Sequence, residues 1–375
     1  MADGTVFVGS QDNHVYALDA TTGDRKWSFE TGWAVNSSPT VADGTVFVGS
    51  FDGNVYALDA TTGDEYWQFT TGNPWRFFGT SERVRSSPTV ADGTAFVGSE
   101  DRHIYALDAA TGDEQWRFET GDWVYSSPTV ADGTVFVGSR DRHVYALDAT
   151  TGDVYWRFET NFSVRSSPTV ADGTVFVGSS DNHVYALDAK TGDVYWRFKT
   201  GSGVYSSPTI ADGTVFVGSV DDHVYALDAE TGDEHWQFET GWAVRSSPTV
   251  ADGTVFVGSG DNHLYALDVE TGDEYWHFET GFAVRSSPTV ADGTVFVGSE
   301  DGQIYALDAG VDGSSECSRT HLGTLGHHDQ LATVDEEIDI KDADEQLPGF
   351  GVGSALAGIG ATTYLLRRRL DDESQ

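Results

Sequence analysis

The sequence is short of several residue types, and each shortage excludes a class of protein. Its single cysteine, Cys317, cannot form an intrachain disulfide framework or a cysteine-rich metal site. Lysine and arginine together number 21, against 60 aspartate and glutamate residues, and the formal net charge is −39. Because no basic surface is available to neutralise phosphates, we expect no binding to nucleic acid. The first 309 residues also lack the periodicity of an amphipathic helix, which excludes a helical fold for this region.

The acidic excess is a physical constraint in its own right. A net charge this large destabilises a compact state through self-repulsion in dilute salt. At molar salt the Debye length falls to about 3 Å, and the repulsion is screened. The composition therefore favours a protein adapted to high salt, as in a halophilic archaeon. An acidic calcium store and a binder of basic partners are the alternatives.

What the sequence does contain is one unit, repeated. Its core, Ala-Asp-Gly-Thr-(Val/Ala)-Phe-Val-Gly-Ser followed by (Val/Ile/Leu)-Tyr-Ala-Leu-Asp, occurs eight times. The period is 40 residues, except for 49 between the second and third copies, where an insertion covers residues 73–83. A strict period of this length indicates a repeat architecture. The copies begin at Ala2, Ala42, Ala91, Ala131, Ala171, Ala211, Ala251 and Ala291.

Each unit holds four short segments of strand type. They are rich in Val, Phe, Tyr, Thr and Trp, and Ala-Asp-Gly and Thr-Gly-Asp turns separate them. The strand cores are apolar on both faces, as in a sheet that is covered on both sides. We expect the glycine that ends each Val-Phe-Val-Gly to allow close approach of a neighbouring side chain. Four antiparallel strands per unit, repeated radially, predict the blades of a β-propeller.

The junction between the third and fourth strands carries a family resemblance. It reads Ala-Leu-Asp-(Ala/Val)-x-Thr-Gly-Asp-x-x-Trp in seven copies. This resembles the tryptophan-docking motif of the pyrroloquinoline-quinone-like (PQQ-like) β-propeller repeat family. That family includes quinoprotein alcohol dehydrogenases and non-catalytic scaffolds such as the lipoprotein of the bacterial outer-membrane assembly machinery. The resemblance implies that each motif tryptophan packs between neighbouring blades as a structural residue. These residues are Trp27, Trp67, Trp116, Trp156, Trp196, Trp236 and Trp276.

The first and last copies are incomplete. Residues 2–30 lack the first strand of a blade, and residues 286–309 lack the fourth. We therefore predict an all-β, eight-bladed propeller of four-stranded antiparallel blades over residues 1–309, with incomplete first and last blades. The two missing strands would be consecutive in a closed ring, so we also hypothesise that the natural chain starts upstream of Met1. An in-frame stop codon just before Met1 would contradict this hypothesis.

The repeat stops after Ala309, and two further regions follow. Residues 310–347 are acidic and polar, which predicts a disordered linker. Residues 348–375 begin with Pro348-Gly349-Phe350, continue with an apolar run over 352–366 and then reach an arginine cluster. This order resembles the archaeal Pro-Gly-Phe sorting signal, which an archaeosortase is expected to cut.

The physical reading of the C-terminus agrees with that resemblance. The apolar run is near the lower length limit of a membrane-spanning hydrophobic helix, and the arginines would stay cytoplasmic. We expect a propeller that is extracellular and anchored to the cell surface through its C-terminus, with an uncleaved membrane anchor as the alternative. No signal peptide is apparent in the given chain, and an upstream start would explain this.

Near-identical blades argue against catalysis. The resemblance implies that an enzyme of the dehydrogenase branch needs a calcium ion held by Glu and Asn, a catalytic Asp and a quinone pocket, all at blade-specific departures from the repeat. The aspartates here recur in every copy, which is typical of turn residues. The histidines at one repeat position are too far apart to share a metal ion, and we expect them to be exposed turn residues. We therefore assign no catalytic, cofactor-binding or metal-binding residue, and expect no cofactor.

One variable position interrupts the regularity. The residue before Ser-Ser-Pro is often Arg or Tyr, and aromatic residues lie just upstream. Such residues are typical of binding hot spots, and a partial ring of arginines could hold an anionic group. The alternative is that these arginines pair with Asp or Glu of the repeat. The candidate binding residues are Arg85, Arg165, Arg245, Arg285, Tyr125, Tyr205, Trp33, Trp123 and Trp242.

The sequence thus predicts a monomeric, non-enzymatic binding or scaffold protein. Its expected partner is a protein or an anionic ligand on the top face of the propeller, which these loops and the insertion form. A PQQ-dependent quinoprotein oxidoreductase, with PQQ and calcium as cofactors, is the alternative function. A passive structural component of the cell envelope is a further alternative.

Overall fold

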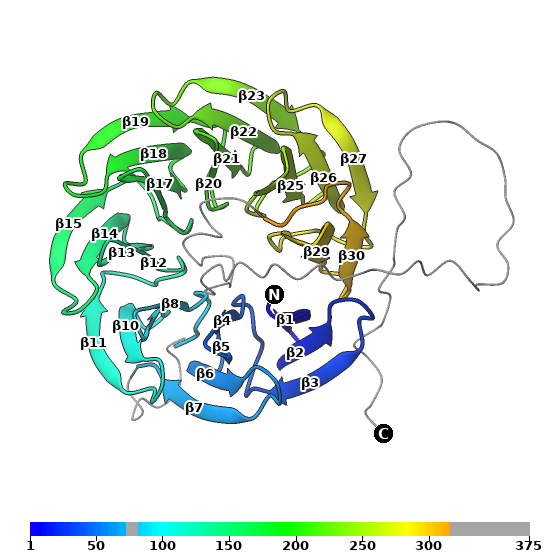
Figure 1. The fold of residues 1–375 in the computed structure, drawn as a ribbon. Helices are drawn as coiled ribbons and strands as arrows, with labels where there is room; N and C mark the ends of the chain where they lie inside the picture. Colours follow the sequence, from blue (N-terminus) through cyan, green and yellow to red (C-terminus); the bar gives the residue numbers. More distant parts are fainter. Residues whose placement is uncertain (73–81, 316–375) are drawn as a thin grey trace, which may run out of the picture.

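The computed structural model describes residues 1–72 and 82–315, which form a ring of eight antiparallel sheets (Figure 1). This part of the chain contains strands but no helix, and so none that is long and apolar enough to cross a membrane. The predicted eight-bladed propeller is confirmed. The predicted sorting signal, the predicted linker beyond Ser315 and most of the insertion lie outside the described residues.

The strands follow the chain order within each blade, from the centre of the ring outward. Blade 1 comprises β1 (Thr5–Gly9), β2 (His14–Asp19) and β3 (Arg25–Glu30). Blade 2 comprises β4 (Thr40–Ala42), β5 (Thr45–Gly49), β6 (Asn54–Asp59) and β7 (Glu65–Thr70). Blade 3 comprises β8 (Thr89–Ala91), β9 (Thr94–Gly98), β10 (His103–Asp108) and β11 (Glu114–Glu119). Blade 4 comprises β12 (Thr129–Ala131), β13 (Thr134–Gly138), β14 (His143–Asp148) and β15 (Val154–Glu159).

The second half of the ring repeats this plan. Blade 5 comprises β16 (Thr169–Ala171), β17 (Thr174–Ser179), β18 (His183–Asp188) and β19 (Val194–Lys199). Blade 6 comprises β20 (Thr209–Ala211), β21 (Thr214–Gly218), β22 (His223–Asp228) and β23 (Glu234–Glu239). Blade 7 comprises β24 (Thr249–Ala251), β25 (Thr254–Gly258), β26 (His263–Asp268) and β27 (Glu274–Glu279). Blade 8 comprises β28 (Thr289–Ala291), β29 (Thr294–Gly298) and β30 (Ile304–Asp308).

The turn between the first two strands of a blade is set by its Asp-Gly pair. In blade 5, Asp172 has a φ of 47° and Gly173 a φ of 74°. Two successive left-handed residues match the twist of a tight hairpin, and Asp-Gly tolerates this conformation better than most pairs. The turn brings β16 and β17 into register, with Ala171 opposite Thr174. The same pair recurs in every blade, so the sequence repeat is also a repeat of backbone geometry.

The hydrophobic core lies between blades. One buried cluster joins Phe176 and Trp196 of blade 5 to Val215 and Leu227 of blade 6. The connection to the next blade lies close against the glycine that ends Val-Phe-Val-Gly. A Cβ atom on Gly178 would lie 2.4 Å from Cγ1 of Val204, which no packed side chain tolerates. The expected close approach at this glycine is confirmed.

The motif tryptophans lie at the outer end of the same interfaces. Trp156 packs against Gly192 of the next blade, where a Cβ would lie 2.8 Å from the indole Cδ2. Its Nε1 donates a hydrogen bond of 3.0 Å to the carbonyl oxygen of Ala189. The same bond is made by Trp27, Trp67, Trp116, Trp196 and Trp236. Trp276, which faces the incomplete blade 8, is only half-buried.

The ring closes between two three-stranded blades. Blade 1 lacks an inner strand and blade 8 lacks an outer one within the described residues, as predicted. After β30 the chain turns back toward the start of blade 8, where Ser315 N donates to Val290 O at 2.9 Å. The hypothesis of an upstream start remains a prediction.

Replacing Gly178 by alanine should lower the free energy of unfolding by about 1–3 kcal/mol, because the added methyl group overlaps Val204. Val204→Ala removes the overlapping methyl groups, so the two changes should be less than additive in the double variant. Guanidinium denaturation of the single and double variants measures this. Fully additive losses would mean that the two side chains do not clash.

Replacing Trp156 by phenylalanine should lower the denaturation midpoint more than Trp276→Phe does. Only Trp156 has a hydrogen bond to the next blade to lose, a bond worth about 1 kcal/mol. Trp276→Phe is the comparison variant, because its half-buried indole has neither this bond nor as much buried area to lose. Equal midpoints for the two variants would contradict a role for the hydrogen bond.

Candidate binding face at the centre of the ring

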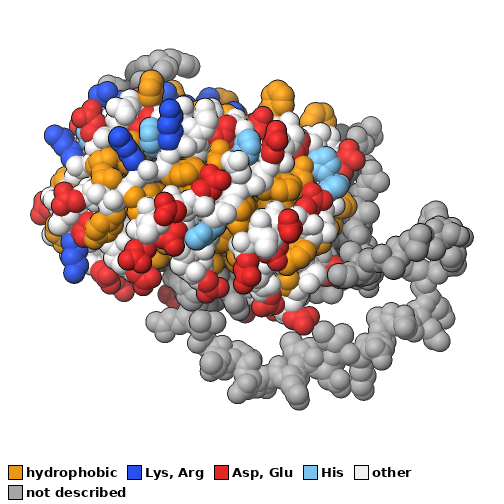
Figure 2. Space-filling model, turned by 90° about the horizontal axis from the view of Figure 1, so that it is seen from above, with side chains coloured by type: hydrophobic (Ala, Val, Ile, Leu, Met, Phe, Trp, Pro, Cys, Tyr) orange, Lys and Arg blue, Asp and Glu red, His pale blue; other side chains and the backbone are white. Residues whose placement is uncertain are grey.

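The ring has two faces of different chemistry. On the face that we call the turn face, the hairpin turns meet each other, as where Ala189 N donates to Gly173 O. On the opposite face, the loop face, the connections between blades meet the remaining turns, as where Thr200 N donates to Asn182 O. The Asp-Gly and Thr-Gly-Asp turns make the turn face acidic. Figure 2 shows most of the visible Lys and Arg along one edge of the disc, and abundant Asp and Glu along the other.

Every connection but one on the loop face is held by an aspartate of the next blade. The backbone N–H of Asn161 donates to Oδ2 of Asp181 at 2.9 Å, and the hydroxyl of Tyr185 donates to the same oxygen at 2.8 Å. Gly121 and Asp141 form the equivalent bond at 2.6 Å. These aspartates therefore fix the loops, which is why they recur in the repeat.

The histidines of this face are also part of the turns. The Nδ1 atom of His183 lies 3.0 Å from the carbonyl oxygen of Asp181, and the ring packs beside Tyr185. The prediction that these histidines are exposed was wrong, because this packing leaves each of them half-buried. The six are His14, His103, His143, His183, His223 and His263.

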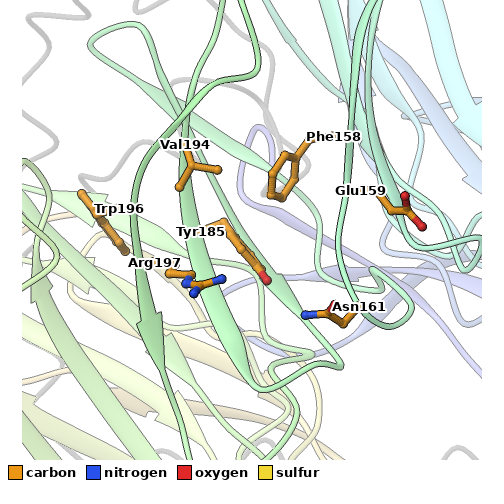
Figure 3. Close-up of a pocket in the computed structure, with 7 residues that line it drawn as sticks. All are labelled: Phe158, Glu159, Asn161, Tyr185, Val194, Trp196 and Arg197. Atoms are coloured by element: carbon orange, nitrogen blue, oxygen red, sulfur yellow. The ribbon is translucent and has the colours of Figure 1, made fainter.

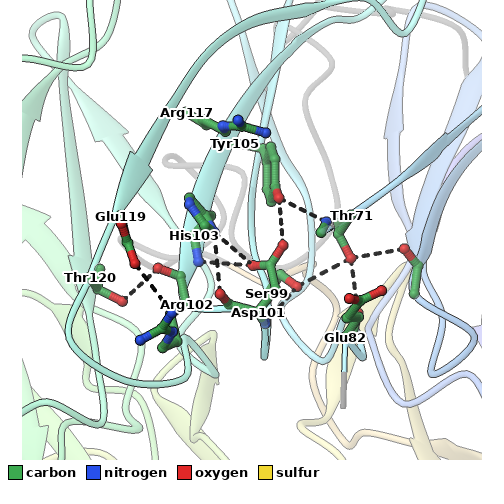
Figure 4. Close-up of polar contacts among 12 residues, drawn as sticks. Thr71, Glu82, Ser99, Asp101, Arg102, His103, Tyr105, Arg117, Glu119 and Thr120 are labelled. Carbon is green, nitrogen blue, oxygen red and sulfur yellow. Dashed lines mark hydrogen bonds and ion pairs between the residues drawn. The ribbon is translucent and has the colours of Figure 1, made fainter. Parts of the chain in front are cut away.

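Blade 3 carries a variant of this arrangement next to the insertion (Figure 4). The hydroxyl of Tyr105 donates to Asp101 Oδ2 at 2.5 Å and accepts a bond from Gly72 N at 3.0 Å. Thr71 Oγ1 donates to Glu82 O at 2.9 Å, which joins the two sides of the insertion. In this connection the loop N–H therefore donates to the hydroxyl of Tyr105 and not to the carboxylate of Asp101.

These contacts shift the pKa values of three groups. Burial opposes ionisation of Asp101, but hydrogen bonds from His103 and Tyr105 outweigh it and lower its pKa. The hydrogen bond to Asp101 raises the pKa of His103. Burial, followed by the charge of Asp101 and the hydrogen bond to it, raises the pKa of Tyr105, so the hydroxyl stays protonated.

The central feature of the loop face is a row of arginines that alternate with aromatic rings. The guanidinium carbon of Arg165 lies 5.1 Å from the ring centroid of Tyr205 and 5.6 Å from that of Tyr125. On one side, Arg245 lies over Tyr205 at 5.6 Å. On the other, Arg85 lies over Tyr125 at 5.1 Å. Such contacts between a cation and an aromatic face are attractive and hold the guanidinium groups in place.

Further members extend the row toward the first blades. Arg85 also covers Phe51, at 4.4 Å, and Arg83 lies over Trp33 at 4.9 Å. Arg140 lies over Trp123 at 4.5 Å and over Tyr125 at 5.4 Å. We call this row the arginine–aromatic belt. It comprises Trp33, Phe51, Arg83, Arg85, Trp123, Tyr125, Arg140, Arg165, Tyr205 and Arg245.

The belt lies near the centre of the ring because of the strands that follow it. Five of its members stand directly before a Ser-Ser-Pro motif. Each of these motifs leads into an inner strand, namely β8, β12, β16, β20 or β24. Neighbouring inner strands are joined by side chains, as where Ser127 N donates to Ser167 Oγ at 2.9 Å. Figure 1 shows these strands facing the centre of the ring.

The arginines differ in their carboxylate partners. Arg85 Nε lies 2.5 Å from Glu100 Oε1, and Arg285 pairs with Glu300 at 2.8 Å. Among the described residues, Arg165 and Arg245 make no ion pair. The alternative that the arginines pair with carboxylates thus holds for two of the four. Their partners, Glu100 and Glu300, stand at a variable position and not among the constant residues of the repeat.

The sequence did not lead us to predict a role for that variable position. It directly follows Val-Phe-Val-Gly-Ser and touches the incoming loop, as where Arg140 N donates to Trp123 O at 2.9 Å. At Gly260, a Cβ atom would lie 2.7 Å from Cδ1 of Trp242. The signal was available, because this position departs from the repeat as strongly as the one before Ser-Ser-Pro. Its occupants are Gln11, Phe51, Glu100, Arg140, Ser180, Val220, Gly260 and Glu300.

The nine predicted binding residues therefore divide into two groups. Arg85, Arg165, Arg245, Tyr125, Tyr205, Trp33 and Trp123 lie in the belt. Trp242 and Arg285 share the loop face but do not join the belt. Trp242 is 66% exposed, and Trp33, Phe162 and Phe282 at the equivalent loop position are also exposed. The loop face thus offers both cationic and apolar contact sites.

A pocket of about 490 Å³ opens elsewhere, between blades 4 and 5 (Figure 3). Apart from Asn161, the residue types that line it recur at the same positions of other blades, so it offers little that is specific to one site. It does not include any residue of the belt. The lining residues are Phe158, Glu159, Asn161, Tyr185, Val194, Trp196 and Arg197.

The described residues hold no cluster of acidic side chains that resembles a calcium site. Within residues 1–72 and 82–315, no three His, Cys, Asp or Glu side chains gather as metal ligands would. The charged donors of the belt are guanidinium groups, which repel a cation, and its carboxylate neighbour Glu100 is already paired with Arg85.

Three family models match the chain. Residues 1–77 and 239–316 match the outer membrane protein assembly factor BamB. Residues 74–254 match the β-propeller of the beta-alanine-activating enzyme. Residues 347–369 match the PGF-CTERM motif. No curated protein sequence matches the chain.

Solved structures share the fold at low sequence identity. BamB from Moraxella catarrhalis superposes with a TM-score of 0.69 and 21% identity, over 81% of this chain and 93% of its own. The computationally designed Ika8 protein gives a TM-score of 0.72 and 19% identity, over 82% and 93%. A europium-containing methanol dehydrogenase gives 0.68 and 16%, over 84% and 82%. A designed protein, an assembly factor and an enzyme thus share this architecture.

Replacing His103 by asparagine, the residue at this position in blade 2, should flatten the pH dependence of stability. The folded pKa of His103 is raised above its ordinary 6.5, so its protonated form stabilises the fold below that pH. This contribution is lost as the pH rises through the folded pKa. The thermal midpoint should therefore fall more in the wild type than in His103→Asn between about pH 6 and pH 8. Circular dichroism at constant ionic strength measures this, and parallel curves would contradict it.

Proposed function

The chain belongs to the PQQ-like β-propeller repeat family and carries a C-terminal PGF-CTERM motif, and we propose that it is a non-enzymatic binding module at the outer surface of the cell. The C-terminal motif supports the location. The acidic composition supports a salt-rich environment. The loop face is the binding surface in this proposal, and a partner protein is its ligand.

The belt is the observation that carries the proposal. In a chain of near-identical repeats, the arginines and aromatic rings that precede Ser-Ser-Pro differ between blades and contact one another on one face, around the centre of the ring. Such an asymmetric set of side chains on an otherwise uniform scaffold suits a specific, asymmetric partner. Arginine and aromatic side chains are also the residue types that contribute most binding energy at protein interfaces.

A PQQ-dependent oxidoreductase is the alternative, since the family includes quinoproteins and a methanol dehydrogenase shares the fold. The binding module is preferred because the belt presents guanidinium groups, and no three His, Cys, Asp or Glu side chains gather among the described residues. A passive component of the envelope is a further alternative, and it gives no reason for arginines without carboxylate partners on an acidic protein.

A pull-down from the envelope fraction of the source cells tests the binding module. The double variant Trp242→Ala/Phe282→Ala removes two exposed rings from the loop face and should reduce recovery of the partner by about tenfold or more. Tyr195→Ala removes a similarly exposed ring from the outer strand β19. It is the matched control and should leave recovery of the partner unchanged. Equal recovery with all variants would contradict binding through the loop face, and no partner with the wild type would favour a passive component.

Reconstitution tests the alternative. We expect no dye-linked alcohol oxidation after incubation of the full chain with PQQ and calcium chloride. Turnover that depends on both additions would establish the oxidoreductase and overturn the non-enzymatic assignment.

A further inference from the structure

We propose that one part of the belt, formed by Arg140, Arg165, Arg245, Tyr125 and Tyr205, binds an acidic peptide segment of a partner protein. We call it the anion site. The inference rests on the proposed binding function and specifies the ligand that this surface recognises. It concerns blades 4 to 7, where the belt is not neutralised.

The first argument is charge. Arg85, on one side of the anion site, is paired with Glu100, and Arg285, on the other side, with Glu300. Between them, Arg140, Arg165 and Arg245 make no ion pair within the described residues. On a chain with a net charge of −39, carboxylates are abundant, yet none is placed against these guanidinium groups. The anion site is therefore a positively charged patch on an acidic molecule, open to a ligand that brings its own carboxylates.

The second argument is unused hydrogen-bonding capacity. In the described part of the chain, the only buried side-chain nitrogen atoms without a hydrogen-bond partner are Nε of Arg140 and Nε of Arg165. A buried donor without an acceptor costs about 1–3 kcal/mol. Both of these donors fall in the same site, beside Tyr125. A carboxylate that draws the guanidinium groups toward it gives these donors an acceptor and relieves that cost.

The third argument is preorganisation. Tyr125 lies under Arg85, Arg140 and Arg165 at 5.1, 5.4 and 5.6 Å, and the hydroxyl of Tyr125 accepts a bond from Nη1 of Arg140. Rings that cover the faces of the guanidinium groups leave their edges to form paired hydrogen bonds with carboxylates. Because the rings already restrict the guanidinium groups, binding needs only a small shift and costs less conformational entropy than it would for freely rotating arginines.

Exposed rings on the same face favour a ligand that also carries apolar side chains. Trp242 and Phe282 are exposed in the connections that lead to Arg245 and Arg285. A peptide that combines carboxylates with apolar side chains uses both the arginines and the exposed rings.

The test is fluorescence anisotropy with the full chain and a fluorescein-labelled peptide of six glutamates, at 0.5 M and 2 M potassium chloride. Hexaglutamine carries the same label and no charge. We expect the wild type to bind hexaglutamate and not hexaglutamine. Arg165→Gln should weaken binding by about tenfold or more, since it removes charge-assisted hydrogen bonds.

Two further variants make the outcome specific. Arg165→Lys keeps the charge but loses the planar donor pair, and should also weaken binding. Arg142→Gln removes an equal charge from the same face, where Arg142 pairs with Glu159 at 3.1 Å, and should change binding by less than about twofold. Circular dichroism spectra that match the wild type show that each variant is folded.

Several results would overturn the proposal. Equal losses for Arg165→Gln and Arg142→Gln would mean that binding follows overall charge alone. Absence of hexaglutamate binding by the wild type would refute the site, and so would tighter binding of trigalacturonate, which would indicate a sugar ligand. A partner captured through Trp242 and Phe282 without any effect of Arg165→Gln would refute the anion site but leave the binding function standing. Hexaglutamate binding without a captured partner would refute the binding function but leave the anion site standing.

Discussion

The contact between neighbouring blades at a single glycine is the constraint on which the rest of the structure depends. At Gly178 there is no room for a Cβ atom, because Val204, in the connection that leads to the next blade, occupies that place at 2.4 Å. The outer end of the same interface is filled by Trp156, which packs on Gly192 and bonds to Ala189. Inner and outer contacts together fix the angle between blades. A ring closes only if that angle repeats, so the repeat cannot vary at these positions.

Side chains that differ between blades and serve binding must therefore lie outside the packed contacts between blades. These are the residue before Ser-Ser-Pro, the residue after Val-Phe-Val-Gly-Ser and the position in the connections that is aromatic in most of them. All three lie on the loop face, because the aspartates of the turns bind the connections there. The scaffold thus brings these three variable positions together on one face, and the belt results from contacts between their side chains across several blades.

Much of the architecture could be predicted from sequence because it depends on local, repeated patterns. The strand types, the Asp-Gly turns, the close approach at the glycine and the two incomplete blades follow from the spacing of residues. The contacts within the belt do not. Arg165 and Tyr205 make contact although they are 40 residues apart in sequence. The ion pair between Arg85 and Glu100 depends on how the connections fold over the turns. Burial of the histidines was misjudged for a related reason, since it comes from the tyrosine beside each ring and not from the turn alone.

The opposite chemistry of the two faces gives the disc an electric dipole along its axis. Aspartates crowd the turn face, whereas the arginines without partners lie on the loop face. Within a Debye length of an acidic surface, such a dipole experiences a torque that turns the loop face toward that surface. At molar salt this length is only about 3 Å, so the alignment acts in the last step of an encounter and not at a distance. The dipole then influences the orientation of a bound partner more than its association rate.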